Sequence, residues 1–454
     1  MRTDEYDVVV LGAGSGGQPV AEGLAGAGLA VAVVEEHRVG GECPYVACIP
    51  SKALLLAAAA GVGWGEAVRR RDHAAEHRDD SGTAEGVSSA GAALVRGRGR
   101  VTGPGELAVG DRRLHWTRAL VVATGSSPVR PPVAGLDGLG DALWTSDQAL
   151  STHEQPRRLL VLGGGAVGCE LGQAFARLGT TVTLVEVAPR LLASEQPFVG
   201  ETLAAALRRD GVDVRAGVEA TAVRREGADV VLVLQDGSSV TGDRLLLAGG
   251  RAPRGAGLGL ESLQVDPDDG AVRVDARCRA VDRSGRPRPD VFAVGDVTGV
   301  APFTHTASYQ AEVVVAELTG RGRDADYRAV PRVVYTDPSV FAVGTTLESA
   351  ERDGADLAVG GMDLEGTARS FIEQPDPAGR LELLARRRDR VVVGAAVVGP
   401  AAESWGGELG LAVRAGLTAD LLADHVHPHP GWSEAVHPAA LDLIRELDGG
   451  RSEQ

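Results

Sequence analysis

Two cysteines with four residues between them are the part of this chain best suited to chemistry. Cys43 and Cys48 lie in the run Gly-Gly-Glu-Cys-Pro-Tyr-Val-Ala-Cys-Ile-Pro-Ser-Lys, just downstream of a glycine-rich turn. A thiolate from such a pair can attack a disulfide and exchange electrons through a mixed disulfide. The context therefore indicates a redox-active pair rather than a structural crosslink.

The same run ends at Lys52, the only lysine among the 46 basic residues of the chain. Lysine carries a compact point charge, whereas arginine carries a planar fork of donors. Because arginine serves everywhere else, we expect position 52 to need the ammonium group itself.

Two glycine-rich turns occur in the chain, each set in the same order of predicted elements. A short apolar strand leads into the turn, a helix follows, and a second strand ends in a glutamate. The strand, turn, helix and strand are predicted at residues 7–11, 12–17, 18–28 and 30–34 in the first case, and at 158–162, 163–168, 169–178 and 181–185 in the second. Each first glycine precedes its acid, Glu35 or Glu186, by 23 residues.

This layout is typical of dinucleotide-binding domains. The glycines let the backbone approach a pyrophosphate at the helix N-terminus, and the carboxylate reaches a ribose hydroxyl. One such motif is a weak signal, but two in register are a strong one. The chain is therefore predicted to be an α/β protein with two Rossmann-like dinucleotide-binding domains.

The composition disfavours several other classes of protein. A length of 454 residues allows about three domains of roughly 150 residues each. The 46 basic and 62 acidic residues give a net charge of −16, which disfavours nucleic acid or an anionic membrane as a partner. Four cysteines do not make a secreted disulfide framework, and no apolar run is long enough to span a membrane. The N-terminus enters a strand without a signal peptide, so we expect a cytoplasmic protein.

Two further strands end in short polar motifs, and the C-terminal part of the sequence differs in character from the rest. A strand over residues 120–123 ends in Thr124-Gly125, and a strand over 290–294 ends in Gly295-Asp296. After about residue 328 the character of the sequence changes. In this part strands are predicted at 332–335, 381–385 and 391–398, and a helix at 404–415; a further helix is predicted before it, at 307–318, after the strand at 290–294. The C-terminal part is therefore predicted to be a separate α+β domain.

In order along the whole chain, these motifs resemble the two-cysteine flavoprotein disulfide reductases, the family of dihydrolipoamide dehydrogenase, glutathione reductase and mercuric reductase. The shared motifs include both glycine turns, the Cys-x4-Cys run, Ala-Thr-Gly, Ala-Val-Gly-Asp and a C-terminal His-Pro-x-x-Ser-Glu. The resemblance implies an FAD-binding domain in two parts, an NAD-binding domain and a dimerisation domain, at residues 1–145 and 271–330, 146–270, and 331–454. It also implies a homodimer whose active sites are shared between the chains.

The resemblance assigns cofactor contacts to residues of these motifs. For FAD they are Gly12, Gly14, Gly17 and Glu35 at the adenosine half, Thr124 and Gly125, Asp296 at a ribityl hydroxyl, and the backbone near His305 at the flavin ring. For the nicotinamide dinucleotide they are Gly163, Gly165, Gly168 and Glu186. A carboxylate at Glu186 accepts hydrogen bonds from a free 2′-hydroxyl and repels a 2′-phosphate, so NADH is favoured over NADPH. The side chain of His305 is expected to be merely packed or exposed.

The resemblance also implies roles for the residues around the thiols. Cys48 is the thiol nearer the flavin, and Cys43 is the thiol that exchanges with the substrate. Lys52 lies near the flavin, paired with Glu170 of the second turn. Two further cysteines, Cys169 and Cys278, are expected to be small buried residues outside the site.

The catalytic base implied by the resemblance is His429, with Glu434 holding the imidazole tautomer. The neighbouring His425, His427 and His437 leave open a metal-binding tract or a merely polar one. The glutamate five residues after His429 favours His429 as the catalytic base, since His427 has no glutamate at that spacing. No metal site is predicted.

The segments beside the disulfide depart from the family pattern. Pro44, Tyr45 and Ala47 are expected to alter its walls, and Trp432 to narrow its access. The predicted function is that of an FAD-dependent, NADH-linked disulfide/dithiol oxidoreductase of the dihydrolipoamide dehydrogenase type, whose small substrate is left open. The alternatives are a flavoenzyme that reduces quinones or another non-disulfide acceptor, and a catalytically idle flavoprotein subunit.

Overall fold

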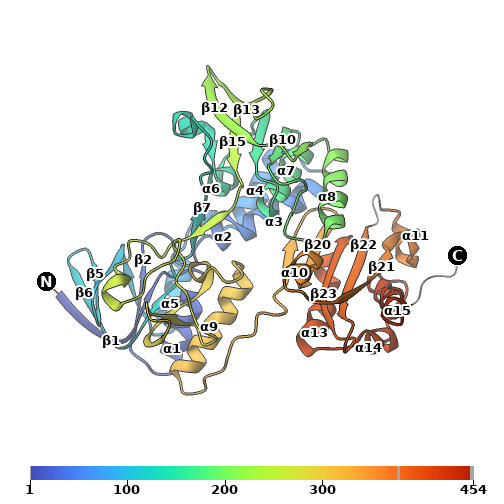
Figure 1. Ribbon diagram of the computed structural model, residues 1–454. Coiled ribbons are helices and arrows are strands. Elements are labelled where there is room, and N and C mark those ends of the chain that lie inside the picture. Colours follow the sequence, from blue (N-terminus) through green and yellow to red (C-terminus); the bar gives the residue numbers. More distant parts are fainter. Residues whose placement is uncertain (1, 376–378, 450–454) are drawn as a thin grey trace. The chain divides into compact units, whose positions relative to one another are not determined.

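The computed structural model describes residues 2–375 and 379–449, which form two compact units (Figure 1). Unit 1 comprises the residues up to 53, together with 69–129 and 250–327. Unit 2 comprises residues 54–68, 130–249 and those from 328 onward. This division does not test the domain ranges predicted from the sequence, which stay a prediction.

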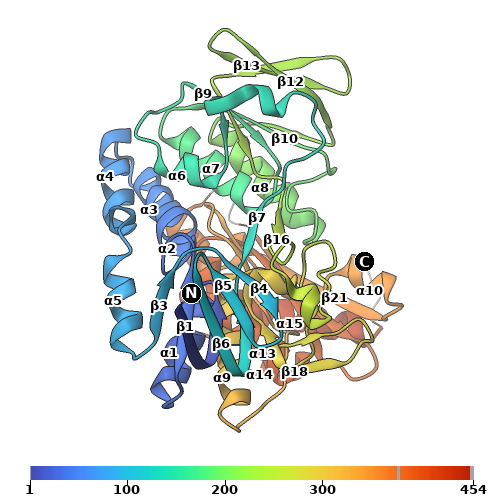
Figure 2. The same cartoon turned by 90° about the vertical axis from the view of Figure 1, so that its left-hand side faces the viewer.

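Unit 1 is built on an eight-stranded sheet in which β17, β18, β6, β1, β2 and β3 follow one another in that order. These strands span Arg279–Val281, Pro287–Ala293, Arg112–Val122, Arg2–Leu11, Val31–Glu35 and Ala93–Arg96. β1 pairs in parallel with β2 and β6, and its residues Val8 to Val10 are fully buried, as in a strand covered on both faces. Two further strands, β4 (Gly99–Gly103) and β5 (Glu106–Val109), continue from β6 (Figure 2).

Two helices, α1 (Gly17–Gly26) and α9 (Thr304–Leu318), pack together beside this sheet (Figure 1). Their apolar residues, Val20 and Leu24 of α1 and Val314 of α9, share one buried cluster with residues of β1 and β2. Because α1 follows β1 directly and both its apolar face and β1 are buried, the glycine turn between them is held firmly in place.

The parallel strands of unit 1 end at one edge of the sheet. Leu11 of β1 is level with Val122 of β6, which is level in turn with Ala293 of β18. The chain leaves these three strands into the first glycine turn, into Thr124-Gly125 and into Gly295-Asp296. The carboxyl edge of a parallel sheet is where such folds bind ligands, so the register gathers the predicted FAD residues there.

Unit 2 contains a parallel sheet of five strands, in the order β11, β10, β9, β15 and β8. They span Asp213–Ala216, Thr181–Glu186, Arg158–Leu162, Arg244–Leu247 and Leu143–Trp144. Helices α7 (Ala166–Arg177) and α8 (Pro197–Arg209) bury their apolar faces against it. A small antiparallel sheet of β12 (Ala220–Glu226), β13 (Asp229–Leu234) and β14 (Ser239–Gly242) belongs to the same unit (Figure 2).

The C-terminal part of unit 2 is an antiparallel sheet in the order β19, β20, β23, β22 and β21. Its strands span Arg332–Val334, Ser339–Gly344, Val392–Gly399, Arg380–Arg386 and Leu357–Asp363. Helices α13 (Gly407–Ala415), α14 (Ala419–Asp424) and α15 (Val436–Leu447) share its buried cluster (Figure 1). The prediction of an α/β protein with two dinucleotide-binding domains and a C-terminal α+β domain is confirmed.

One predicted helix is divided in the structure. Residues 404–415 were expected to form a single helix, but α12 (Ala402–Trp405) ends before Gly406 and α13 begins after it. A Cβ at Gly406 would lie 2.4 Å from the ring of Phe341 on β20. The glycine therefore lets the chain cross an aromatic side chain of the sheet, a contact that helical periodicity alone does not reveal.

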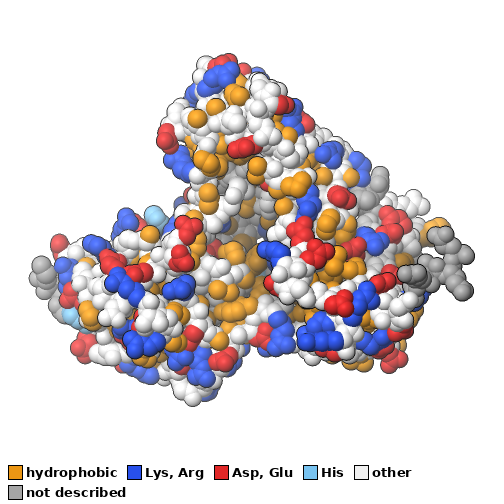
Figure 3. Space-filling model, viewed as in Figure 1, with side chains coloured by type: hydrophobic (Ala, Val, Ile, Leu, Met, Phe, Trp, Pro, Cys, Tyr) orange, Lys and Arg blue, Asp and Glu red, His pale blue; other side chains and the backbone are white. Residues whose placement is uncertain are grey.

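Charged side chains of both signs are interspersed over the face shown in Figure 3. Many charged side chains of the described residues are ion-paired; Arg390, for example, pairs with Asp420 and Asp448 at 2.7 Å each. Every helix among the described residues is too short or too polar to cross a lipid bilayer.

Candidate active site

Both cysteines of the predicted redox pair begin a helix. α2 (Cys43–Val46) starts at Cys43, and α3 (Cys48–Ala59) starts at Cys48. Both residues are half-buried and in the thiol form. The Cys48 sulfur and burial raise the pKa of Cys43, while Thr304 and Lys52 act in the opposite direction. The structure therefore brings the two thiols close enough to control each other's ionisation, as a redox pair requires.

Thr304, the first residue of α9, is a site residue that the sequence analysis missed. Its Oγ1 lies 3.4 Å from the Sγ of Cys48, which is 256 residues earlier in the chain. The adjacent His305 stacks its ring on Phe303, with the ring planes 8° apart and the centroids 5.2 Å apart. The His305 side chain is thus packed against its neighbour, as expected, and Thr304 presents a hydroxyl to the thiol pair.

A chain of polar contacts runs beside the thiols and was also missed. Glu42, which precedes Cys43, pairs with Arg251 at 2.5 Å. Arg251 Nε donates to Ser126 Oγ at 2.7 Å, and Ser126 Oγ donates to Asp296 Oδ2 at 2.6 Å. Glu42, the residue beside the thiol predicted to exchange with the substrate, is thereby linked to Asp296, the residue predicted to bind the ribityl chain.

The first glycine turn leaves no room for side chains at two of its positions. Gly12 has φ +103°, and a Cβ there would lie 2.3 Å from the carbonyl oxygen of Ala123. A Cβ at Gly17 would lie 1.8 Å from the carbonyl oxygen of Gly12. At Gly14 the nearest atom would be the Cα of Gly41 at 3.6 Å, an ordinary contact, so this glycine leaves the turn open to a ligand.

The second turn repeats this geometry. Gly163 has φ +116°, and its Cβ would lie 2.5 Å from the backbone of Ala248. A Cβ at Gly168 would lie 2.0 Å from the carbonyl oxygen of Gly163. Gly165, like Gly14, would meet nothing closer than 4.0 Å. The two turns are copies of one tight strand-to-helix connection, which exposes backbone N–H groups at a helix N-terminus.

The two acids after the turns are also held alike. Each carboxylate accepts one N–H from its glycine turn and one from two residues beyond the acid. The donors are Ala13 and His37 for Glu35, and Gly164 and Ala188 for Glu186. Because a carboxylate has about four acceptor sites, each acid keeps capacity for ribose hydroxyls. The residues of both turns therefore fit a dinucleotide.

Lys52 and Glu170 belong to different units. In unit 1 the Nζ of Lys52 donates to Ser51 Oγ at 3.3 Å. In unit 2 Glu170 is 5% exposed and accepts the backbone N–H of Tyr335 at 2.9 Å. Their pairing with each other stays a prediction.

The predicted base and its carboxylate are in contact. His429 Nδ1 lies 2.7 Å from Glu434 Oε2. The other oxygen of Glu434 accepts the backbone N–H of Ala368, the first residue of α11 (Ala368–Glu373). Glu434 is thereby held in place and occupies one ring nitrogen of His429, whose side chain is 72% exposed.

Two of the residues that depart from the family pattern do not act as expected. Tyr45 is 1% exposed, and its hydroxyl lies 2.9 Å from Thr83 Oγ1, so its ring faces inward. Trp432 is 9% exposed and packs in the core of the C-terminal part of unit 2. The expectation that they line the substrate approach is therefore wrong for both rings. Cys169 and Cys278 are fully buried as expected, and burial raises the pKa of each.

Comparison with protein-family models decides the relationship. The model described as pyridine nucleotide-disulphide oxidoreductase matches residues 6–311, and that of the dimerisation domain of such proteins matches residues 330–440. The chain belongs to the pyridine nucleotide-disulphide oxidoreductases. It is thus an oxidoreductase of an FAD- and pyridine nucleotide-dependent family, and it carries the family's dimerisation domain.

Individual proteins of this kind are similar to the chain over nearly its full length. Dihydrolipoyl dehydrogenase from Thermus scotoductus is 34% identical, covering 97% of this chain and 98% of the relative. Dihydrolipoyl dehydrogenase from Chlorobaculum tepidum is 33% identical, covering 98% of each. A solved Cu(II) complex of the HOCl-induced flavoprotein disulfide reductase RclA from Escherichia coli has a TM-score of 0.87 at 26% identity, covering 96% of this chain and 99% of that one. The predicted family is confirmed.

Proposed function

We propose that this protein is an NADH-linked disulfide/dithiol oxidoreductase of the dihydrolipoamide dehydrogenase type that acts on a small disulfide or dithiol. The observation that carries the proposal is the pair of thiols at the starts of α2 and α3, with the Thr304 hydroxyl 3.4 Å from the Cys48 sulfur. Similarity over the full length to proteins named dihydrolipoyl dehydrogenase supports the same class of activity.

The glycine turns and their acids would hold the two dinucleotides. The first turn and Glu35 bind the adenosine half of FAD, with Thr124, Gly125 and Asp296 at the rest of the cofactor, and the second turn and Glu186 bind NAD(H). When bound, FAD supplies acceptance of hydride from the nicotinamide and delivery of the electron pair to a disulfide. The Glu186 carboxylate supports NADH over NADPH, because it accepts hydrogen bonds from a 2′-hydroxyl and repels a 2′-phosphate.

The thiols of Cys43 and Cys48 carry the exchange with substrate. The Cys43 thiolate attacks one sulfur of the substrate disulfide, forming a mixed disulfide and expelling the first substrate thiolate. The Cys48 thiolate then attacks the Cys43 sulfur, which re-forms the internal disulfide and releases the second thiolate. The electron pair of the dithiol thus ends on the substrate, whose two sulfurs take up two protons. The Thr304 hydroxyl is placed to donate a hydrogen bond to the Cys48 thiolate.

His429 would supply and remove those protons. Its Nδ1 is engaged by Glu434, so Nε2 is the nitrogen that exchanges a proton with sulfur. The imidazole is 72% exposed and lies within the range matched by the dimerisation domain. Both facts support a site that is completed by a second chain, with His429 serving the partner's thiols.

Anaerobic titration with NADH, followed by turnover with lipoamide, tests this function. The wild type should show a long-wavelength thiolate-to-flavin charge-transfer band and reduce lipoamide. Cys43→Ser and Cys48→Ser should each abolish lipoamide reduction while keeping FAD and NADH-to-dye activity, because reduction of the flavin needs no thiol. Retained disulfide turnover in either variant would refute the mechanism.

Mixed dimers test the shared site. Cys48→Ala and His429→Ala chains, each inactive alone, are unfolded together and reassembled. If the base serves the partner's thiols, a hybrid carries both faults in one site and none in the other. Random mixing makes half the dimers hybrid, so activity should return to about a quarter of the wild-type value for a two-fold symmetric dimer. Hybrids that are detected by mass spectrometry but stay inactive would place the base within its own chain.

A further inference from the structure

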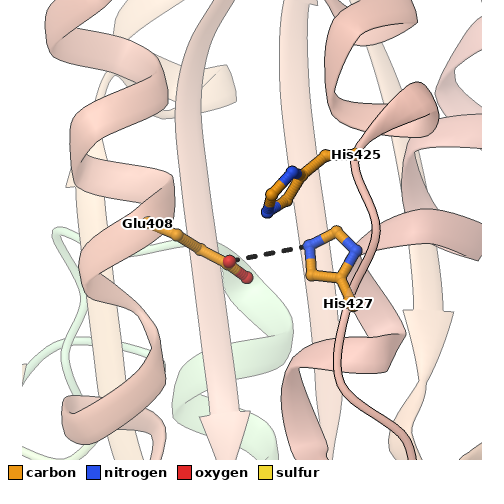
Figure 4. Close-up of side chains that lie close together, drawn as sticks. All are labelled: Glu408, His425 and His427. Carbon is orange, nitrogen blue, oxygen red and sulfur yellow. Dashed lines mark ion pairs between the residues drawn. The ribbon is translucent and has the colours of Figure 1, made fainter.

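Three side chains of the C-terminal part of unit 2 converge outside the site described above. Glu408 lies on α13, and His425 and His427 follow the end of α14. Figure 4 shows the carboxylate and both imidazoles pointing toward one another. One ligand atom from each residue lies within 4.8 Å of the others, and the two rings meet edge to face at 79°. Three residue types that ligate metals thus face a common point.

The polar atoms at this point lack hydrogen-bond partners. The side chain of His427 is 3% exposed, and within the described residues neither of its ring nitrogens has a hydrogen-bond partner. The same holds for Oε1 of Glu408. The Nε2 of His427 lies 3.5 Å from Glu408 Oε2, too far for a good hydrogen bond. Buried polar atoms in folded proteins are normally satisfied, so this cluster needs another partner.

We propose that Glu408, His425 and His427 form a binding site for a divalent transition-metal ion of the zinc type. Zinc is bound by imidazole nitrogen and carboxylate oxygen, and sites with three protein ligands leave a fourth position to water. Mg²⁺ and Ca²⁺ prefer all-oxygen sites and do not fit two imidazoles. A cation here would take up lone pairs of His427 Nε2 and Glu408 Oε1, two of the three orphaned atoms. His425 is exposed, which gives the ion a way in.

Burial also acts on the ionisation of two of these groups. Burial and the neighbouring His425 lower the pKa of His427. Burial raises the pKa of Glu408 to about 7. Without a cation beside it, that carboxylate is buried at a cost, and a bound ion would offset the cost.

The site would fix the segment that carries the proposed base. His427 is two residues before His429, and only Pro428 separates them. A metal ion bound by Glu408 of α13 and by His427 would anchor this segment on the N-terminal side of His429. Glu434 holds His429 from the C-terminal side. The proposal thus goes beyond the redox chemistry and does not depend on it.

Isothermal titration of the full-length FAD-loaded protein with Zn²⁺ tests the site. The Cys43→Ser/Cys48→Ser protein is used throughout, because the dithiol would itself bind zinc. It should bind one Zn²⁺ per chain at neutral pH and no Mg²⁺. Loss of an outer-shell partner alone costs about 10- to 100-fold in affinity, so His425→Ala, His427→Ala and Glu408→Gln should each weaken binding by at least about tenfold.

The matched control is His73→Ala, which should leave Zn²⁺ affinity unchanged. His73 is an exposed histidine of α4 (Trp64–Ala74), in the part of that helix that belongs to unit 1. His425→Ala is the decisive variant, because truncating an exposed side chain does not threaten folding. If His425→Ala left the Zn²⁺ affinity of the Cys43→Ser/Cys48→Ser parent unchanged, or if that parent bound no stoichiometric Zn²⁺, the proposal would be overturned.

Discussion

Replacing Gly17 by alanine should weaken FAD binding without unfolding α1. The new Cβ would lie 1.8 Å from the Gly12 carbonyl oxygen, whereas real Cβ atoms essentially never come within 3.0 Å, so turn and helix would have to separate by about 1.2 Å. Both atoms are attached to backbone, so no side-chain rotation relieves the clash. Overpacking of this kind costs about 1–3 kcal/mol. If the FAD-bound turn carries this strain, the Kd for FAD should rise by roughly 5- to 150-fold.

The same substitution at Gly26, the last residue of α1, provides the control, because nothing lies within 4 Å of its Cβ. FAD retained after desalting and the Kd of the apoprotein for FAD are the measurements, with circular dichroism reporting the fold. In the second turn, Gly168→Ala should instead weaken NADH binding and spare FAD, since its Cβ meets the Gly163 oxygen at 2.0 Å. Wild-type FAD affinity in a folded Gly17→Ala protein, or equal losses in Gly26→Ala, would show that the tight contact does not shape the site.

Three further substitutions address the thiols, the nucleotide and the fold. The contact with Thr304 lowers the pKa of Cys43, so Thr304→Val should raise that pKa. The rising limb of the pH profile of disulfide turnover should then move to higher pH. A pH profile that does not move would contradict the role of this contact. Glu186→Arg should raise the NADPH-to-NADH ratio of kcat/KM by about tenfold or more, since hydrogen bonds to charged groups contribute about 1.5–3 kcal/mol; a wild type that already prefers NADPH disproves the role of Glu186. Asp72→Ala removes the carboxylate 2.8 Å from the fully buried guanidinium of Arg71. It should destabilise the protein by about 3–5 kcal/mol in urea unfolding, and a loss below about 1 kcal/mol would count against the pair.

The parts of the site that the sequence predicted are those built from short stretches of chain. A strand, a tight turn, a helix and a second strand set the interval between Gly12 and Glu35, and the structure repeats it between Gly163 and Glu186. His429 and Glu434 are five residues apart and meet directly. Such relations follow from local geometry, so residue types and spacing are enough to find them.

The missed contacts depend on how distant segments come together. Thr304 reaches Cys48 across 256 residues, and Arg251 reaches Glu42 across 209. Both depend on the position of α9 and on the pairing of β16 (Arg251–Pro253) with β7 (Ser126–Pro128), which no local pattern specifies. The wrong expectation for Tyr45 has a related cause, because a four-residue helix does not show which face is buried.

The polar contacts from Glu42 through Arg251 and Ser126 to Asp296 offer a path of energetic coupling between the thiol pair and the Asp296 end of unit 1. Such a coupling acts equally in both directions. A change at one end that alters the arrangement of the other must be matched by an equal coupling in the reverse direction. If oxidation of Cys43 changes the affinity of the Asp296 end for its ligand by some factor, binding of that ligand changes the equilibrium for oxidation of the thiol pair by the same factor. If Asp296 binds FAD as proposed, a mutation along this chain of contacts that changes the affinity for FAD through the coupling should also change the tendency of the thiols to oxidise.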